Sequence, residues 1–380
     1  MGKVSKEDLA FPVDLLEIAV EFSGMAPRVP GVKPWYYMPL VLLAHVIYVN
    51  GYLCTSLYLL SERPFFDKME SLQCFLSLFH MFAKYCNVHY NTSPYRRLLA
   101  TARHIWEEGV RLRPQYHKLT ADIANEAKLS MKLILLLFAG AVPTSSVMTF
   151  IYNMQVESKD RETLYMVWDP VPDESWYWTS CLYEGSVMAL SLMLLATSLA
   201  ACYWHCLMAA GQMRVLQTML EEDKVDIKAC AILHQNILGY VKQIQDYFSG
   251  QMFLEVVLAS LQNSMRAYMC MKMFSNGDPK AIGASFILVL CMIGPFIVCL
   301  SGHVVTDNSE KVFIAAYQGK WYASDVRDQR GLAIISTMAT KIIRLHYRGL
   351  LDFNMERYSM VQQATYSYVT LLKGADVDLV

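Results

Sequence analysis

The chain alternates between long apolar stretches and shorter polar ones. Four stretches, residues 34–61, 133–156, 185–213 and 281–306, contain no Asp, Glu, Lys or Arg over 24 to 29 residues. A helix needs roughly 20 apolar residues to cross the hydrocarbon core of a bilayer. The pattern therefore predicts a membrane-spanning helix at each of these four positions.

Three further segments are predicted to span the membrane although each has an unusual feature. Residues 72–90 are apolar except for Lys84, whose long stem is expected to carry its charge to the membrane interface. Residues 251–274 contain three charged side chains and are expected to face protein more than lipid. Residues 358–372 are short and polar. The sequence thus predicts an all-α polytopic membrane protein with seven transmembrane helices.

Basic residues are distributed unequally between the two sides of this predicted membrane. One side carries 22 Lys and Arg residues, whereas the other side carries 6. The basic side consists of residues 1–37, 91–128, 210–250 and 303–350. Because cytoplasmic loops are enriched in Lys and Arg, the N-terminus is predicted inside the cell and the C-terminus outside. Two of the basic segments also show helical periodicity, which predicts cytoplasmic helical extensions.

The segment before the last predicted span is also strongly periodic. Within residues 331–353, an apolar stripe is formed by Ile335, Met338, Ile342 and Leu345. This spacing predicts a helix that either lies on the membrane surface or packs against the cytoplasmic extensions. Packing is favoured, because the neighbouring cytoplasmic segments are themselves predicted to be helical.

Composition and motifs argue against several classes of protein. Of the 380 residues, 54% are hydrophobic and 18% are charged, a composition that excludes a disordered chain. The net charge of −1 disfavours nucleic acid as a partner. The sequence contains no phosphate-binding loop, no hydrolase nucleophile motif and no zinc-binding motif. Intramembrane carboxylates are limited to Glu255 and the flanking Glu184, fewer than proton-coupled transporters usually carry. We therefore expect neither an enzyme nor a bound cofactor or metal.

The last span carries the clearest candidate for a functional element. Its 15 uncharged residues reach about 22 Å as a helix, which is less than the roughly 30 Å of hydrocarbon. Polar side chains facing lipid would be costly, so protein or water is expected around this helix. One face is formed by Gln362, Thr365 or Tyr366, Val369 and Leu372. This face is interpreted as a pore lining with an apolar constriction, and the alternative is an ordinary packing helix.

The outer halves of the middle spans combine aromatic, Met and small polar residues. Such a mixture is typical of an apolar small-molecule cavity with a few hydrogen-bonding groups, although plain helix packing explains it too. The candidate ligand-binding residues are Phe75, Leu76, Phe79, His80, Thr144, Ser145, Met148, Tyr152, Tyr183, Val187, Met188, Ser191, Asn263 and Ala267. Phe79, Met148 and Tyr152 would suit a small aromatic ligand through ring stacking and thioether contacts.

Two motifs near the C-terminus resemble those of a known family. Residues 365–373 read Thr-Tyr-Ser-Tyr-Val-Thr-Leu-Leu-Lys, and this ending resembles the closing motif of insect odorant receptors. Upstream, Tyr317, Trp321 and Tyr322 are similar to an aromatic element that the family carries before its last span. The motifs cover about 310–373, while the rest of the chain agrees in length, number of spans and orientation.

This resemblance implies an odorant-gated, non-selective cation channel that functions in olfaction. Members of the family assemble as tetramers with a common co-receptor, Orco, in the plasma membrane of sensory neuron dendrites, and pass monovalent cations and calcium. By motif position, Val369 would be the hydrophobic gate and Leu372 the next pore-lining residue. Because Orco typically carries glutamine at the position of Leu372, this chain is expected to be an odorant-tuning subunit that forms a heterotetramer with Orco.

The same resemblance divides the chain into three regions. Residues 1–300 would form the first six spans, with a pocket for a small volatile in their outer half. Residues 301–357 would form a cytoplasmic anchor between subunits, and residues 358–380 the pore helix and an extracellular tail. A heptahelical G-protein-coupled receptor is the main alternative, but its N-terminus would lie outside, against the distribution of Lys and Arg. A transporter or a scaffolding membrane protein is a third possibility.

Overall fold

The computed structural model describes residues 9–12, 38–62, 64–155, 176–222, 224–278, 281–319, 321–323 and 325–377. Its helices, in chain order, are α2 (Met38–Leu60), α3 (Phe65–Tyr90), α4 (Thr92–Leu112), η2 (Pro114–Tyr116), α5 (His117–Gln155), α6 (Tyr177–Leu220), α7 (Ile227–Ser275), α8 (Ala281–Gln318), η5 (Trp321–Ala323), α9 (Val326–Ala339) and α10 (Met355–Val377). Two short antiparallel strands, β1 (His346–Tyr347) and β2 (Leu351–Asp352), precede α10. The fold is therefore all-α apart from one hairpin within the described residues, as predicted.

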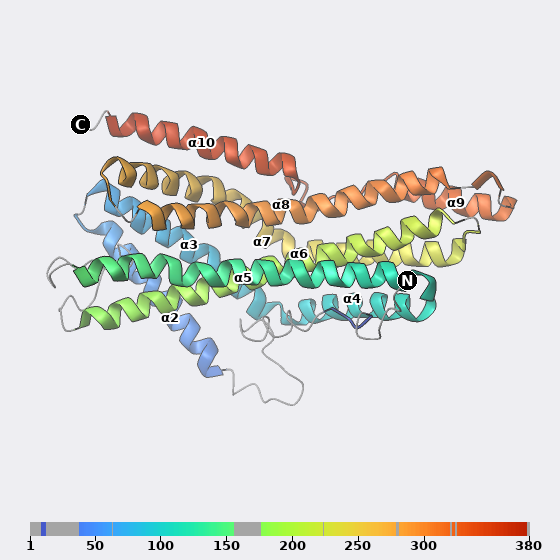
Figure 1. Ribbon diagram of the computed structural model, residues 1–380, viewed down its shortest axis with the longest axis horizontal. Coiled ribbons are helices and arrows are strands. Elements are labelled where there is room, and N and C mark those ends of the chain that lie inside the picture. The colour runs from blue at the N-terminus through green and yellow to red at the C-terminus, as the bar shows by residue number, and fades with distance from the viewer. Residues whose placement is uncertain are drawn as a thin grey trace.

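The predicted spans coincide with the long helices of the structure. Helices α2, α3, α5, α6, α7, α8 and α10 overlap the seven predicted segments in order. Figure 1 shows α5 to α8 running along nearly the whole length of the molecule, with α2, α3 and α10 in one half and α4 and α9 in the other. Among the described residues, α6 and α8 are long and apolar enough to cross a membrane by length and composition alone.

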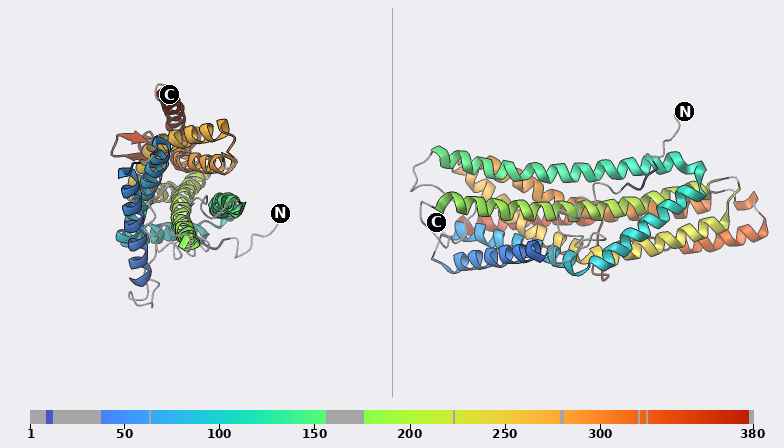
Figure 2. Two further views of the ribbon diagram at one scale, coloured as in Figure 1. Left: turned by 90° about the vertical axis from the view of Figure 1, so that its left-hand side faces the viewer. Right: turned by 90° about the horizontal axis from the view of Figure 1, so that it is seen from below.

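The long helices extend well beyond the thickness of a bilayer. Helix α7 has 49 residues and α6 has 44, whereas about 20 residues cross the hydrocarbon core. The extra turns continue into the half of the molecule that holds α4 and α9 (Figure 2). The predicted helical extensions are thus present on the side that the Lys and Arg count assigns to the cytoplasm.

Helix α6 forms the centre of the bundle. It packs against α5, α7 and α8, and most residues of its inner half are buried. Four alanines, Ala200, Ala201, Ala209 and Ala210, are at most 1% exposed. Small side chains let helix backbones approach closely, so α6 can hold three neighbours at once.

The N-terminal segment 9–12 is fixed against the cytoplasmic half of the bundle. The indole N–H of Trp106 donates to the carbonyl of Leu9 at 3.0 Å, and that of Trp204 donates to the carbonyl of Pro12 at 2.9 Å. The ring of Phe11 lies edge-on to both tryptophans. These contacts place this part of the N-terminal region on the predicted inner side.

The periodic stretch 331–353 is not one helix, which corrects the sequence-based prediction. Helix α9 ends at Ala339, and residues 346–352 form the β1–β2 hairpin. Arg348 and Gly349 have φ angles of 48° and 71°, and Leu350 N donates to Tyr347 O at 2.9 Å. Three residues, 348–350, separate the paired Tyr347 and Leu351, and two of them are left-handed, so the chain turns back into a hairpin instead of continuing the helix that the apolar stripe predicted.

The hairpin connects α10 tightly to α8. Phe353, which follows β2, is 1% exposed and packs beside Gly302 of α8, where the hydrogen of glycine leaves room for the Phe353 carbonyl. The main-chain N–H of Ile343 donates to Ser309 Oγ at 2.9 Å. Helix α8 itself runs without a break through residue 301, where the division into regions was predicted.

Candidate functional site

A cavity of about 480 Å³ lies among α2, α3, α6, α7 and α8. Residues from the part of each helix nearest the predicted outer side line the cavity, and most of its surface is apolar. Apolar contacts come from Leu78, Val187, Met188, Ile287 and Leu290, among others. A mostly apolar cavity with a few convergent polar groups is the usual form of a small-molecule site.

Five of the candidate ligand-binding residues lie on this cavity. They are His80, Tyr183, Val187, Met188 and Ser191. Tyr183 also accepts a hydrogen bond from Asn50 Nδ2 at 2.8 Å, which joins α6 to α2 at the cavity wall. The four candidate residues on α6 thus lie together on one wall of the cavity.

Other candidate residues lie away from the cavity. Phe75 packs edge-on against Tyr52 at 5.4 Å between ring centroids, and Phe79 is 45% exposed. Leu76 packs against a cluster that we call the methionine cluster, formed by Met69, Met265, Tyr268 and Met269. Asn263 is fully buried and Ala267 is half-buried, and neither lines the cavity. The side chains of Thr144, Ser145, Met148 and Tyr152 lie outside the described part of the structure.

The positions on α3 explain why its aromatic residues miss the cavity. Cys74, Ser77, Leu78 and Met81 line it. Because successive helical residues are about 100° apart, residues 75 and 79 point to another side of the helix. Of the four candidate residues selected on α3, His80 lies on the side that borders the cavity, and the other three do not.

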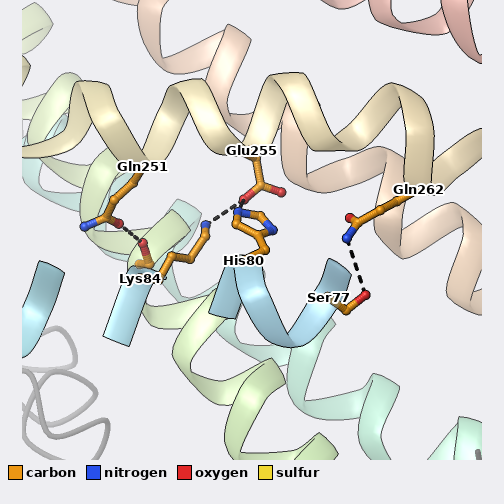
Figure 3. Close-up of polar contacts among 7 residues, drawn as sticks. Ser77, His80, Lys84, Gln251, Glu255 and Gln262 are labelled. Atoms are coloured by element: carbon orange, nitrogen blue, oxygen red, sulfur yellow. Dashed lines mark hydrogen bonds and ion pairs between the residues drawn. The ribbon is translucent and has the colours of Figure 1, made fainter. Parts of the chain in front are cut away.

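A row of polar contacts joins α3 to α7 along the cavity (Figure 3). Gln73 Nε2 donates to the main-chain oxygen of Gln262 at 3.0 Å, and Gln262 Nε2 donates to Ser77 Oγ at 3.5 Å. Further along, Asn87 Nδ2 donates to Tyr247 O at 3.4 Å. Polar groups within a bilayer must be satisfied by protein, so this row fixes the register of the two helices.

The same row contains a buried ion pair that the sequence did not reveal. Lys84 Nζ donates to Glu255 Oε2 at 2.6 Å, and His80 Nε2 lies 3.2 Å from the same oxygen (Figure 3). Lys84 is 1% exposed and Glu255 is 6% exposed. The expectation that Lys84 carries its charge to the interface is therefore wrong, because a carboxylate on α7 meets it inside the bundle.

Helix α10 packs on one side only, against α7 and α8 (Figure 1). Thr365 is buried and donates its hydroxyl to Val361 O at 2.9 Å, while Leu372 packs on the methionine cluster. Gln362 and Val369 are half-buried, and Tyr366 is 73% exposed. In the single chain, the candidate pore residues thus span one broad face of the helix, from the side packed on the bundle at Thr365 and Leu372 to the exposed side at Tyr366.

The outward side of α10 is polar as well as aromatic. Gln363, Tyr366, Ser367 and Thr370 are exposed there. A helix of this composition is poorly suited to lipid, as the sequence predicted. Within the described residues, no group of three or more His, Cys, Asp or Glu side chains is arranged to hold a metal ion.

Comparison with known proteins links this architecture to one family. The family model described as 7tm Odorant receptor matches residues 66–366. Odorant receptor 85b of Drosophila melanogaster is 27% identical over 141 residues, which are 37% of this chain and 35% of that protein. Odorant receptor Or1 of Anopheles gambiae is 20% identical over 157 residues, 40% of this chain and 36% of that protein. The matches to these relatives thus span about a third of their length.

The fold has a solved counterpart. The structure of the insect olfactory receptor OR5 from Machilis hrabei in complex with eugenol superposes with a TM-score of 0.81. The alignment covers 96% of this chain and 97% of that chain at 13% sequence identity. The structure of the same receptor described without eugenol gives a TM-score of 0.79. Together the family model and the shared fold confirm the predicted all-α, seven-transmembrane architecture.

Proposed function

Because this chain belongs to the 7tm odorant receptor family, we propose that it is the odorant-tuning subunit of a volatile-gated, non-selective cation channel. The observation that carries the proposal is the largely apolar cavity of about 480 Å³ inside the membrane half of the bundle. A small volatile fits such a space, and the receptor OR5 of Machilis hrabei was solved in complex with eugenol. The family match also disfavours the alternative of a heptahelical G-protein-coupled receptor.

Odorant binding would act by favouring the open state of the channel. A ligand shifts a conformational equilibrium only through a difference in affinity between the two states. The cavity is bordered by α3 and α7, and Leu372 of α10 packs on the methionine cluster contributed by those same helices. A change in the spacing of α3 and α7 would therefore reach the outer end of α10 through direct contacts.

Helix α10 would line a central pore shared with neighbouring subunits. Its polar outward side is unsuited to lipid, and its half-buried Val369 would form the apolar constriction, with Gln362, Thr365, Tyr366 and Leu372 along the same path. The partners would be Orco subunits in a heterotetramer within the plasma membrane of a sensory dendrite, and the permeant ions monovalent cations and calcium. We infer that residues 301–357 form the cytoplasmic anchor between subunits.

The direct test is to record currents from cells that express the chain with and without Orco. A panel of small volatiles should evoke a cation current with a reversal potential near zero only when both chains are present. Responses that require a G protein, in cells where the volatile evokes no cation current through the expressed chains, would contradict the channel assignment.

A polar substitution at the proposed constriction should open it. Val369→Ser is expected to raise the basal current several-fold in the assembled channel, because a hydroxyl lowers the barrier to wetting. Leu371→Ser is the matched control: two residues turn a helix by about 200°, so this side chain lies on the opposite side of α10 and its basal current should stay at the wild-type level. Equal basal currents in the wild type and both variants would remove Val369 from the gate.

A further inference from the structure

One oxygen of the buried Glu255 carboxylate has no partner among the residues that the structure describes. Lys84 and His80 both approach Oε2, and Figure 3 shows the second oxygen, Oε1, directed away from them. Glu255 is 6% exposed and lines the cavity. A buried carboxylate oxygen that accepts no hydrogen bond costs free energy. A ligand that brings a hydrogen-bond donor into the cavity would therefore gain more binding free energy there than at an exposed acceptor.

The wall opposite this oxygen leaves it accessible. Gly294 of α8 also lines the cavity, and a Cβ atom at this position would collide with Oε1. Any other residue at position 294 would fill the space beside the carboxylate. The absence of a side chain at this point of α8 therefore keeps Oε1 within reach of a molecule in the cavity.

The charges around the cavity favour a neutral molecule. The two carboxylates, Glu255 and Glu184, are matched by two basic groups, Lys84 and Arg266, so their formal charges cancel. A cationic amine would add a charge that no lining group balances, and burying such a charge is expensive. A hydroxyl group can donate to Oε1 without bringing a charge of its own.

We propose that Glu255 Oε1 is the hydrogen-bond acceptor that selects neutral, hydroxyl-bearing odorants over their ethers. This assignment rests on the proposed function, in which the cavity is the odorant site. The apolar body of the ligand packs against Val187, Met188 and Leu290, and its O–H donates to Oε1. An ether of similar shape has no donor and leaves the carboxylate oxygen unpaired, which is the situation in which binding sites discriminate most strongly.

Matched pairs of compounds test the assignment by direct binding. The purified full chain in lipid nanodiscs is titrated with 2-phenylethanol, hexan-1-ol and 4-ethylphenol and with the methyl ether of each, and Kd is measured by calorimetry. From the usual strength of a hydrogen bond to a charged group, each hydroxyl compound is expected to bind about 10- to 100-fold more tightly than its ether. Ethers that bind as tightly as their hydroxyl partners would overturn the assignment. Such a result would mean that a water molecule donates the hydrogen bond that Oε1 accepts.

Two variants separate the acceptor from general packing. In Lys84→Met/Glu255→Met, both charges are replaced together, so the fold is kept and the preference for hydroxyl over ether should fall to about twofold or less. Leu290→Ala trims the apolar wall and should weaken both members of a pair by the same factor. A preference that survives in the double variant contradicts the role of Glu255.

Binding and current distinguish this inference from the proposed function. Hydroxyl preference in the nanodisc titration without any ligand-evoked current would contradict the channel and leave the Glu255 assignment standing. Ligand-evoked currents with equal responses to alcohols and ethers would support the channel and contradict the Glu255 assignment.

Discussion

Replacing Lys84 alone by methionine is expected to lower the free energy of unfolding by about 3–5 kcal/mol. The substitution leaves the Glu255 carboxylate buried without the ammonium group that lies 2.6 Å from it. Removing one partner of a buried pair is far more damaging than removing both, because the remaining charge has lost its compensation inside a medium of low dielectric constant. The loss is measured by denaturant unfolding of the purified chain in mixed micelles.

The double variant Lys84→Met/Glu255→Met is the matched control for this prediction. Two methionines fill similar space with no charge, so the double variant should unfold within about 1 kcal/mol of the wild type. The pair then shows strong positive coupling in a double-mutant cycle. A Lys84→Met variant as stable as the wild type would mean that Lys84 does not hold Glu255 inside the bundle.

The second large effect is expected at Gly302, where α8 meets the chain that leads into α10. A Cβ atom at this position would overlap the main-chain carbonyl of Phe353, which cannot rotate away as a side chain can. Overpacking in a well-packed interior costs about 1–3 kcal/mol, and a clash with backbone belongs at or above the top of that range. Gly302→Ala should therefore destabilise the chain and separate the hairpin from α8, which also removes the support of α10.

Thermal unfolding and the amount of chain at the cell surface measure this effect. Gly239→Ala on α7 is the matched control, because nothing lies within 4 Å of a Cβ atom at that position. Replacing an exposed helical glycine by alanine should stabilise the chain by about 0.5–1 kcal/mol. If Gly302→Ala unfolds no earlier than Gly239→Ala, the close contact between α8 and the hairpin does not support the fold.

The membrane helices could be predicted because their signal is local. A window without charge, such as 281–306, needs no knowledge of its neighbours to be recognised as a span. The orientation followed from Lys and Arg counts for the same reason. Even the weak last span was found, since its shortness and polarity are visible in 15 consecutive residues.

The Lys84–Glu255 pair could not be predicted because its signal is long-range. The two residues are 171 positions apart, and each one alone is explained by an exposed or interfacial position. Only the register of α3 against α7, set by Gln73, Ser77 and Gln262, brings them together. A sequence pattern within one helix carries no information about that register.

The hairpin before α10 was missed for a different reason. An apolar residue every three or four positions fits a helix, and Ile335 and Leu345 are indeed both buried. Helix α9 nevertheless ends between them, at Ala339, and the hairpin turn follows at Arg348 and Gly349, where only the glycine gave a sign of it. Of the four candidate ligand residues on α3, His80 lines the cavity and the other three do not, because the helical face that meets the cavity is decided by packing partners.

Reagent accessibility along α10 tests most directly whether odorant binding in the cavity opens an aqueous path. Val369→Cys, expressed with Orco, is exposed to a charged, membrane-impermeant methanethiosulfonate from outside the cell, and the wild-type chain with its ten native cysteines serves as the control. The proposed function predicts that an activating odorant speeds modification of the introduced thiol and that the modification changes the current, with no such change in the wild type. A thiol at position 369 that stays unmodified while the odorant-evoked current flows would contradict it.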